Sequence, residues 1–404
     1  MNIVVINQPI KNRGDEAAHR SLVRNLVKAI PDVQISVIFL GYDIKSINEM
    51  IVLCDNVQYI AVHETRGTYR IMKFALKFHL ERLIIRIVPC LNEYFSFVKK
   101  ADYVISAPGG ICLGGFQNWG HLILLQFTKK LNKKIIYYSR SIGPFPEETK
   151  DNKIFKKFSL ELLKSFSFLS VRDSKSMELL YELKIPYFPS IDTAFLDNPD
   201  VLVPIEILSE ITENYIVFVP NSLTWHPDFK NKDQNKIDNF YVKIINELIK
   251  RYSDSKIVLL PQLFYDETKS DADYFIKLSK LITSENLICL PETICSDIQQ
   301  KIISKSRFVI GSRYHSIVFS INNEVPFISL SYEHKMTGLL ELLYLSNRSI
   351  DILSIGEDNF NEDEIINDIN RIIDLPYEGN QPKIKARMMA TDCFKQMIKM
   401  LKNE

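Results

Sequence analysis

The sequence predicts an α/β protein made of two Rossmann-like domains that face a cleft. Its 404 residues exceed what one hydrophobic core usually serves, so two domains are expected. Short, continuously apolar segments of the kind buried in parallel sheets recur in both halves, and helical patterns separate several of them. A composition of 46% hydrophobic and 25% charged residues indicates a chain that folds throughout.

The first half, residues 1–197, is predicted to be one such domain. Its expected strands are the apolar segments 3–6, 34–39, 103–106 and 134–139. The regular pattern stops after Leu196, where asparagine, prolines and short apolar pieces follow one another, so residues 198–213 are interpreted as a linker.

The second half, residues 214–375, repeats the alternation of strands and helices. Expected strands and helices alternate in the order 216–219, 240–251, 257–260, 272–282, 287–290, 298–306 and 308–310. The remaining segment, residues 376–404, is predicted to be a C-terminal helix that packs back on the first domain.

Charge and composition exclude several classes of function. Because 50 Lys and Arg balance 49 Asp and Glu, no broad field exists to hold nucleic acid. The six cysteines are scattered without CxxC pairs or histidines at zinc-ligand spacing, so no metal site is expected. The N-terminus lacks a signal-peptide pattern and no apolar run is long enough to span a bilayer, which predicts a cytoplasmic protein.

Two glycine-containing loops follow predicted strands in the first half. Gly14 and Asp15 lie in the segment NRGDEAA, which opens a helix, and the glycine would let backbone amides approach a ligand; Asp15 as a plain N-cap is the alternative. Gly109 and Gly110 begin the loop PGGICLGG, which lacks the GKS or GKT of a Walker motif. This loop is either ligand-binding or a tight structural crossover.

Two arginines at predicted strand ends are candidate anion ligands. Arg172 lies in SVRDSKS ahead of a helix, where it would hold a carboxylate or phosphate, and a structural ion pair with Asp173 is the alternative. Arg313 and His315 lie in GSRYH, after a buried strand and before a helix. A fixed cation, a group that titrates near neutral pH and a helix N-terminus would meet there, which favours a functional site.

The ordered series of motifs resembles the polysaccharide pyruvyl transferase family. Its members, from residue 7 to about 340, are NRGDEA, PGGICLGG, SIGPF, SVRDSKSMELL, DTAF, GSRYH and VPFISLSYEHK. The family often has an unbroken GGG followed by an acidic residue, whereas here Gly110 is followed by Ile-Cys-Leu and the next polar residues are Gln117 and Asn118. This departure concerns acceptor recognition and leaves the arginine and histidine motif intact.

The resemblance implies a GT-B-like fold and the transfer of pyruvate from phosphoenolpyruvate onto two hydroxyls of a sugar, as a ketal in capsule or exopolysaccharide synthesis. Phosphoenolpyruvate is then a co-substrate, and no other cofactor and no metal are expected. The implied donor ligands are Arg172, Ser312, Arg313 and Lys335, with His315 as acid or phosphate-side donor and Asp192 or Asp15 as base. The implied acceptor ligands are Gly14, Asp15, Gly109, Gly110 and Asn118.

A basic stripe points to a further partner. Arg66, Arg70, Lys73 and Lys77 share one helical face, with Ile71, Phe74, Leu76 and Phe78 beside them, so segment 66–86 is predicted to touch the inner face of an anionic membrane. This would suit a sugar acceptor carried on a polyprenyl diphosphate; a merely solvated face is the alternative. The competing functions are a sugar-nucleotide glycosyltransferase of the same fold and a non-catalytic sugar or anion binder.

Overall fold

The computed structural model describes residues 1–211, 213–264 and 270–403 and divides into two compact units. Unit 1 contains residues 1–10, 15–197 and those from 388 onward, and unit 2 contains residues 11–14 and 198–387. Thr212 of the predicted linker, residues 265–269 of the predicted second domain and Glu404 of the predicted terminal helix lie outside the described residues.

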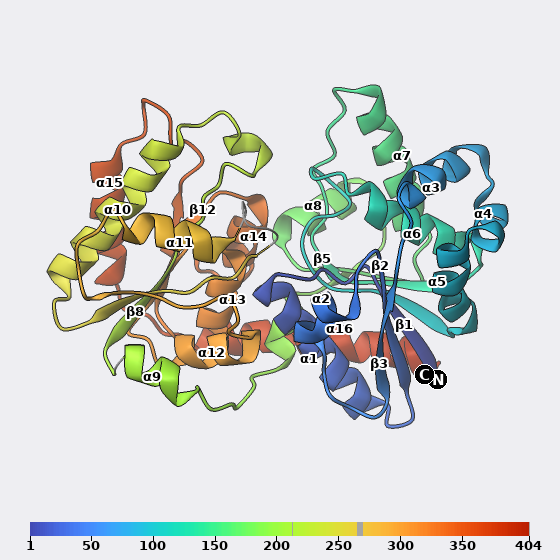
Figure 1. Ribbon diagram of the computed structural model, residues 1–404, viewed down its shortest axis with the longest axis horizontal. Helices are drawn as coiled ribbons and strands as arrows, with labels where there is room; N and C mark the ends of the chain where they lie inside the picture. The colour runs from blue at the N-terminus through green and yellow to red at the C-terminus, as the bar shows by residue number, and fades with distance from the viewer. Residues whose placement is uncertain (212, 265–269, 404) are drawn as a thin grey trace. The chain divides into compact units, whose positions relative to one another are not determined.

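Unit 1 is built on a seven-stranded sheet in which every pairing is parallel (Figure 1). The strand order is β3-β2-β1-β4-β5-β6-β7. The strands are β1 (Asn2–Ile6), β2 (Gln34–Leu40), β3 (Val57–Val62), β4 (Tyr103–Ser106), β5 (Lys134–Arg140), β6 (Phe168–Val171) and β7 (Phe188–Pro189).

The central strand β1 shows why this sheet is covered on both faces. Ile3 and Val5 belong to one core cluster, with helices α1 (Arg13–Ala29) and α16 (Asn380–Lys402), while Val4 and Ile6 belong to a second, with the helices from α3 (Thr68–Phe78) to α8 (Ser174–Glu182). Successive side chains of a strand point to opposite faces, so four consecutive apolar residues require helices on each side. The helices are α1 (Arg13–Ala29), α2 (Ile44–Ile47), α3 (Thr68–Phe78), α4 (Glu81–Ile87), α5 (Pro89–Lys100), α6 (Trp119–Lys130), α7 (Lys150–Leu163), α8 (Ser174–Glu182) and α16 (Asn380–Lys402), with 3-10 turns at Asn48–Met50 and Thr193–Leu196.

Unit 2 repeats this construction with a six-stranded parallel sheet of order β10-β9-β8-β11-β12-β13 (Figure 1). Its strands are β8 (Tyr215–Val219), β9 (Lys256–Leu259), β10 (Leu287–Cys289), β11 (Val309–Gly311), β12 (Phe327–Ser331) and β13 (Ser349–Asp351). Its helices are α9 (Ile205–Ile211), α10 (Gln234–Arg251), α11 (Asp271–Ser279), α12 (Ser296–Ser304), α13 (Tyr314–Asn322), α14 (His334–Leu342) and α15 (Glu362–Ile373), with 3-10 turns at Pro227–Phe229 and Ser346–Arg348.

Both units therefore have the strand order of a Rossmann domain, and the prediction of two such domains is confirmed. Three details differ from the sequence-based expectation. The segment predicted as a linker contains helix α9, residues 11–14 belong to unit 2, and α16 changes unit between Arg387 and Met388. Among the described residues, no helix combines the length and apolar character needed to cross a bilayer.

Candidate functional site

The predicted site residues lie in loops at the carboxyl ends of parallel strands. In a Rossmann sheet the strand order reverses beside the first strand, here between β1 and β4 and between β8 and β11, and ligands bind at the carboxyl edge there. The structure assigns the predicted residues to both units. Unit 1 holds Asp15, Gly109, Gly110, Asn118, Arg172 and Asp192, and unit 2 holds Gly14, Ser312, Arg313, His315 and Lys335.

In unit 1 the glycine-rich loop after β4 is held by a buried arginine from the end of β5. Arg140 donates to the carbonyl oxygens of Ala107 and Gly110, the latter at 3.3 Å. Gly109 has a φ of +151°, and a Cβ there would lie 3.0 Å from Asp15 Oδ1 and 3.3 Å from Arg140 Nη2. A glycine is therefore needed for Asp15 and Arg140 to approach this loop together.

The other two predicted acceptor residues of this region are Gly110 in the loop and Asn118 directly before α6. A Cβ at Gly110 would meet no atom within 4 Å, so close packing does not require a glycine there. Asn118 caps α6, because its side-chain oxygen accepts the backbone N–H of His121 at 2.9 Å. Burial, followed by the charge of Arg140, lowers the pKa of His121 well below its usual range, so this ring beside the loop is neutral at pH 7.

Arg172 and Asp192 form an ion pair in the interior of unit 1. Their side chains are 1% and 0% exposed, and Arg172 Nε also donates to Ser141 Oγ at 3.1 Å. The second oxygen of Asp192 accepts the backbone N–H of Ala194 at 2.9 Å. The ion pair thus involves Asp192, while Asp173 caps α8 by accepting the N–H of Ser176.

In unit 2, Arg313 follows β11 and is oriented by a carboxylate from the start of α11. Asp271 Oδ2 accepts from Arg313 Nε at 3.2 Å, and Asp271 Oδ1 accepts from Nη2. Asp271 Oδ2 in turn accepts the backbone N–H groups of Gln262 at 3.0 Å and Leu263 at 2.9 Å. The ring of Trp225 lies 5.5 Å from the guanidinium. Arg313 is therefore fixed by one carboxylate on one edge.

Arg313 keeps its positive charge, and three of the five N–H groups of its guanidinium do not bond Asp271. Burial opposes the charge, but Asp271 outweighs it and the pKa of Arg313 is raised. A guanidinium carries five N–H groups. Two of them point at Asp271, and the guanidinium makes no other hydrogen bond within the described part of the chain. The remaining N–H groups are available to a planar anion.

His315 lies against Gly14. A Cβ on Gly14 would fall 1.7 Å from His315 Nδ1 and 1.9 Å from its Cγ, distances that no side chain tolerates. The imidazole also packs edge-on against Tyr314, with ring centroids 5.0 Å apart. The two motifs that the sequence places three hundred residues apart thus meet within unit 2, where the glycine makes room for the ring.

The last two predicted donor ligands already have partners. Ser312 is buried and its hydroxyl lies 3.2 Å from Tyr241 Oη. Lys335 Nζ is 2.5 Å from Glu333 Oε2, and His226 Nε2 lies 3.4 Å from Glu333 Oε1. Burial of Glu333 opposes ionisation, but Lys335 and His226 outweigh it and lower the pKa of Glu333 to about 2.

Sequence reasoning missed four residues that shape these loops: Arg140, His226, Asp271 and Glu333. Two of them lie in or beside recognised motifs, because Arg140 directly precedes SIGPF and Glu333 lies within SYEHK. His226 follows β8 as His315 follows β11, a repetition visible only once the sheet order is known. Asp271 carried no local signal, since its partner Arg313 lies 42 positions away.

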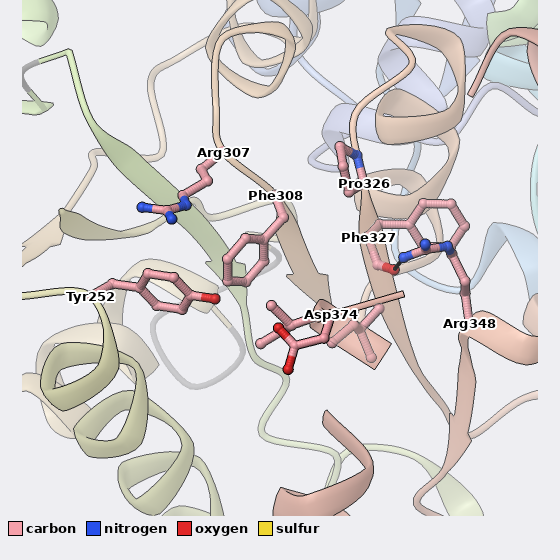
Figure 2. Close-up of a pocket in the computed structure, with 9 residues that line it drawn as sticks. Tyr252, Arg307, Phe308, Pro326, Phe327, Arg348 and Asp374 are labelled. Carbon is pink, nitrogen blue, oxygen red and sulfur yellow. Dashed lines mark hydrogen bonds between the residues drawn. The ribbon is translucent and has the colours of Figure 1, made fainter. Parts of the chain in front are cut away.

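A cavity of about 270 Å³ in unit 2 lies at the opposite edge of the sheet (Figure 2). Arg307 and Phe308 precede β11, and Pro326 precedes β12, so the cavity lies at the amino ends of these strands. Arg348, which lines it, donates to the backbone carbonyls of Phe327, Leu375 and Pro376 and thereby joins chain segments. This cavity is separate from the loops that carry Arg313 and His315.

Two Rossmann-like domains with polar loops at their carboxyl edges define a protein of the GT-B fold class. Solved structures agree on the fold. A UDP-GlcNAc 2-epimerase from Neisseria meningitidis bound to UDP-GlcNAc is similar with a TM-score of 0.58 at 11% identity, covering 100% of both chains. A UDP-glucose:anthocyanidin 3-O-glucosyltransferase in complex with UDP has a TM-score of 0.56 at 10% identity, covering 100% of this chain and 99% of its own.

The sequence itself shows the family. The profile of the polysaccharide pyruvyl transferases matches residues 12–334, and the chain belongs to this family. A relative with a known role is the amylovoran biosynthesis protein AmsJ of Erwinia amylovora, which is 23% identical over 310 residues, or 73% of this chain and 71% of its own. The resemblance inferred from the motifs is therefore confirmed.

Proposed function

We propose that the protein transfers pyruvate from phosphoenolpyruvate to two hydroxyls of a sugar and so forms a ketal in a surface polysaccharide. The observation that carries the proposal is the guanidinium of Arg313, buried and oriented by Asp271, with N–H donors left over. Membership of the pyruvyl transferase family supports the reaction class. The free N–H groups of the guanidinium also suit an anionic substrate such as phosphoenolpyruvate.

Unit 2 is the half to which we assign the donor. Phosphoenolpyruvate carries a carboxylate and a phosphate, and a guanidinium binds either in a planar, two-point manner. Helix α13 begins directly after Arg313 and no side chain within the described residues caps it, so the helix dipole favours an anion at the same place. Lys335, paired with Glu333, is assigned to the donor's surroundings; Ser312, bound to Tyr241, supports the loop.

His315 is the proposed proton donor. In the reaction, the methylene carbon of phosphoenolpyruvate gains a proton and becomes the methyl group, which leaves a cationic character at C2. One hydroxyl bonds to C2, the second hydroxyl follows, and the C2–O bond to phosphate breaks. The two hydroxyls release two protons, of which one balances the new methyl group and one leaves with phosphate. An imidazole held against Gly14 and at the start of α13 suits the donation.

Unit 1 is the half to which we assign the acceptor. Of the two carboxylates considered as general base, Asp15 is the better candidate, because it is 8% exposed whereas Asp192 is fully buried and paired with Arg172. Asp15 lies beside Gly109 in the glycine-rich loop. We assign Arg172 to holding this half together rather than to the donor, and we propose a polyprenyl-diphosphate-linked sugar as acceptor, reached at the inner face of the membrane.

Thermal unfolding of the purified protein with phosphoenolpyruvate, and separately with UDP- and GDP-sugars, tests the donor. A ligand that binds only the native state raises the midpoint. We expect a shift with phosphoenolpyruvate that Arg313→Ala abolishes. A shift with a sugar nucleotide alone would instead indicate glycosyl transfer, and tight binding of a sugar without turnover would indicate a binding protein.

Turnover tests the role of His315. With an acceptor found by screening, release of phosphate from phosphoenolpyruvate is followed by phosphorus NMR, and His315→Gln is expected to slow it by about a hundredfold or more, as loss of a general acid does. Wild-type turnover in His315→Gln would remove this residue from the mechanism. Binding of phosphoenolpyruvate by the same variant is the control that its site is intact.

A further inference from the structure

Helices α3 and α4 of unit 1 expose a cluster of large apolar side chains. Both helices pack on α6, and α4 also packs on α5, so their outer faces form part of the surface of this unit (Figure 1). The exposed side chains, which we call the apolar ridge, are those of Ile71, Phe74, Phe78, Leu83 and Ile87. Because α3 and α4 also contact one another, these exposed side chains lie on neighbouring helices, and exposed apolar side chains gathered in this way mark an interaction surface.

The two phenylalanines carry most of this exposure. Phe74 is 56% exposed and Phe78 is 51% exposed. Their ring centroids lie 4.5 Å apart on successive turns of α3. Leu76, which the sequence pattern placed with them, is buried in the core beneath instead. The apolar residues that the sequence places beside the basic stripe therefore divide into a core-facing and an outward-facing set, and the outward-facing set contains two aromatic rings.

Cations surround the apolar ridge, and carboxylates are almost absent. Between residues 65 and 87 the only acidic residue is Glu81, which is buried. Apart from Lys73, the exposed cations of this segment, which we call the basic rim, are Arg66, Arg70, Lys77, Arg82 and Arg86. On α4 the basic pair 82/86 and the apolar pair 83/87 each repeat at four residues, so they form neighbouring rows.

One cation of the predicted stripe belongs to the fold. Lys73 lies 3.1 Å from Asp151 and 3.7 Å from the ring centroid of Trp119, whose indole N–H also donates to Asp151. Arg82 donates to the carbonyl oxygen of Lys130 at the end of α6. The five members of the basic rim form no ion pair within the described residues, so the surface keeps a net positive charge.

We propose that the apolar ridge and basic rim of α3 and α4 dock the protein on an anionic phospholipid bilayer. Aromatic and aliphatic side chains among lysines and arginines are what an interfacial membrane contact requires, with rings at the level of the acyl chains and cations at the headgroups. A protein partner would need acidic groups opposite each cation, whereas an anionic bilayer offers them everywhere. Under the proposed function, this surface would bring unit 1 to a lipid-linked acceptor.

Sedimentation with vesicles tests the docking without any donor or turnover, so its outcome does not depend on pyruvyl transfer. We expect the full chain to sediment with phosphatidylcholine vesicles that contain phosphatidylglycerol, to bind pure phosphatidylcholine much less, and to be released by salt. Phe74→Ser/Phe78→Ser and Arg70→Glu/Lys77→Glu should each weaken binding by at least about tenfold.

The matched control is Ile276→Ser/Lys280→Glu at the C-terminal end of α11, where Lys280 is the C-cap; it changes a similarly exposed apolar residue and a cation in unit 2 and should leave binding unchanged. Hydrogen exchange on the wild type gives a readout free of variants, in which peptides covering residues 66–87 are expected to become protected on vesicles. Absence of binding, an equal loss in the control, protection elsewhere, or a dimer that buries the ridge in ultracentrifugation would each overturn the proposal.

Discussion

Each unit contains a buried arginine–aspartate pair at the carboxyl edge of its sheet, and the two pairs differ in how the arginine is bonded. In unit 1, Arg172 bonds Asp192 and Ser141 and is 1% exposed. In unit 2, Arg313 bonds Asp271 along one edge and keeps further N–H donors. Arg172 follows β6 whereas Arg313 follows β11, so the same two residue types form a pair at different strands of the two sheets and are bonded differently.

The partner of each arginine explains the difference. The remaining oxygen of Asp192 accepts a backbone N–H from the short turn that follows it. Both carboxylate oxygens of Asp192 therefore have partners inside unit 1. Asp271 also accepts two backbone N–H groups. Its carboxylate would therefore keep hydrogen bonds if the arginine moved toward a ligand. We therefore expect the first pair to stabilise its domain, and we propose that the second orients a ligand-binding group.

The largest expected effect is on stability, and it separates the two pairs. Arg172→Met leaves the carboxylate of Asp192 buried without its cation and should lower the free energy of unfolding by about 3–5 kcal/mol. Arg313→Met should cost about 1–3 kcal/mol, because Asp271 keeps its backbone donors. Urea unfolding measures both, and an equal or larger loss for Arg313→Met would contradict the division.

The double variant Arg172→Met/Asp192→Asn sharpens this test. Once both charges are gone, no uncompensated ion remains, so part of the stability lost by the single variant should return. If the double variant is as unstable as the sum of the single ones, the two side chains do not act as a pair.

A second prediction concerns the acid stability that Glu333 gives to unit 2. Its pKa is lowered from the ordinary 4.5 to about 2, so its contribution is complete above pH 4.5 and disappears as the pH falls towards 2. A shift of this size corresponds to about 3 kcal/mol. Glu333→Gln should be less stable than wild type near pH 6 and nearly equal near pH 2. A stability difference that stays constant over this range would show that the charge of Glu333 contributes nothing.

The two glycines predicted to bind the acceptor give a third, smaller contrast. Gly14→Ala forces a methyl group into the ring of His315 and should cost about 1–3 kcal/mol of stability as well as turnover. Gly110→Ala meets open space and should change stability by less than about 0.5 kcal/mol. Thermal unfolding compares them directly, and a silent Gly14→Ala would mean that His315 is not held as the structure has it.

The sequence predicted much of this fold because parallel strands are apolar and end in recognisable loops. It did not predict the strand at Val57–Val62, most of whose side chains are only partly buried at the edge of the sheet. In the candidate site it found Arg313 and His315 but not Asp271 or the contact with Gly14. These depend on which loops the folded sheet brings together, and no local pattern records that.

Calorimetric titration with phosphoenolpyruvate tests the central claim, that Arg313 is the ligand-binding arginine of unit 2. The wild type should bind, and Arg313→Lys, which keeps the charge but loses the planar fork, should bind about tenfold or more weakly. Arg307→Lys, at the amino end of the same strand beside the cavity of Figure 2, is the matched control and should bind as the wild type does. Wild-type affinity in Arg313→Lys, or an equal loss in Arg307→Lys, would contradict the account.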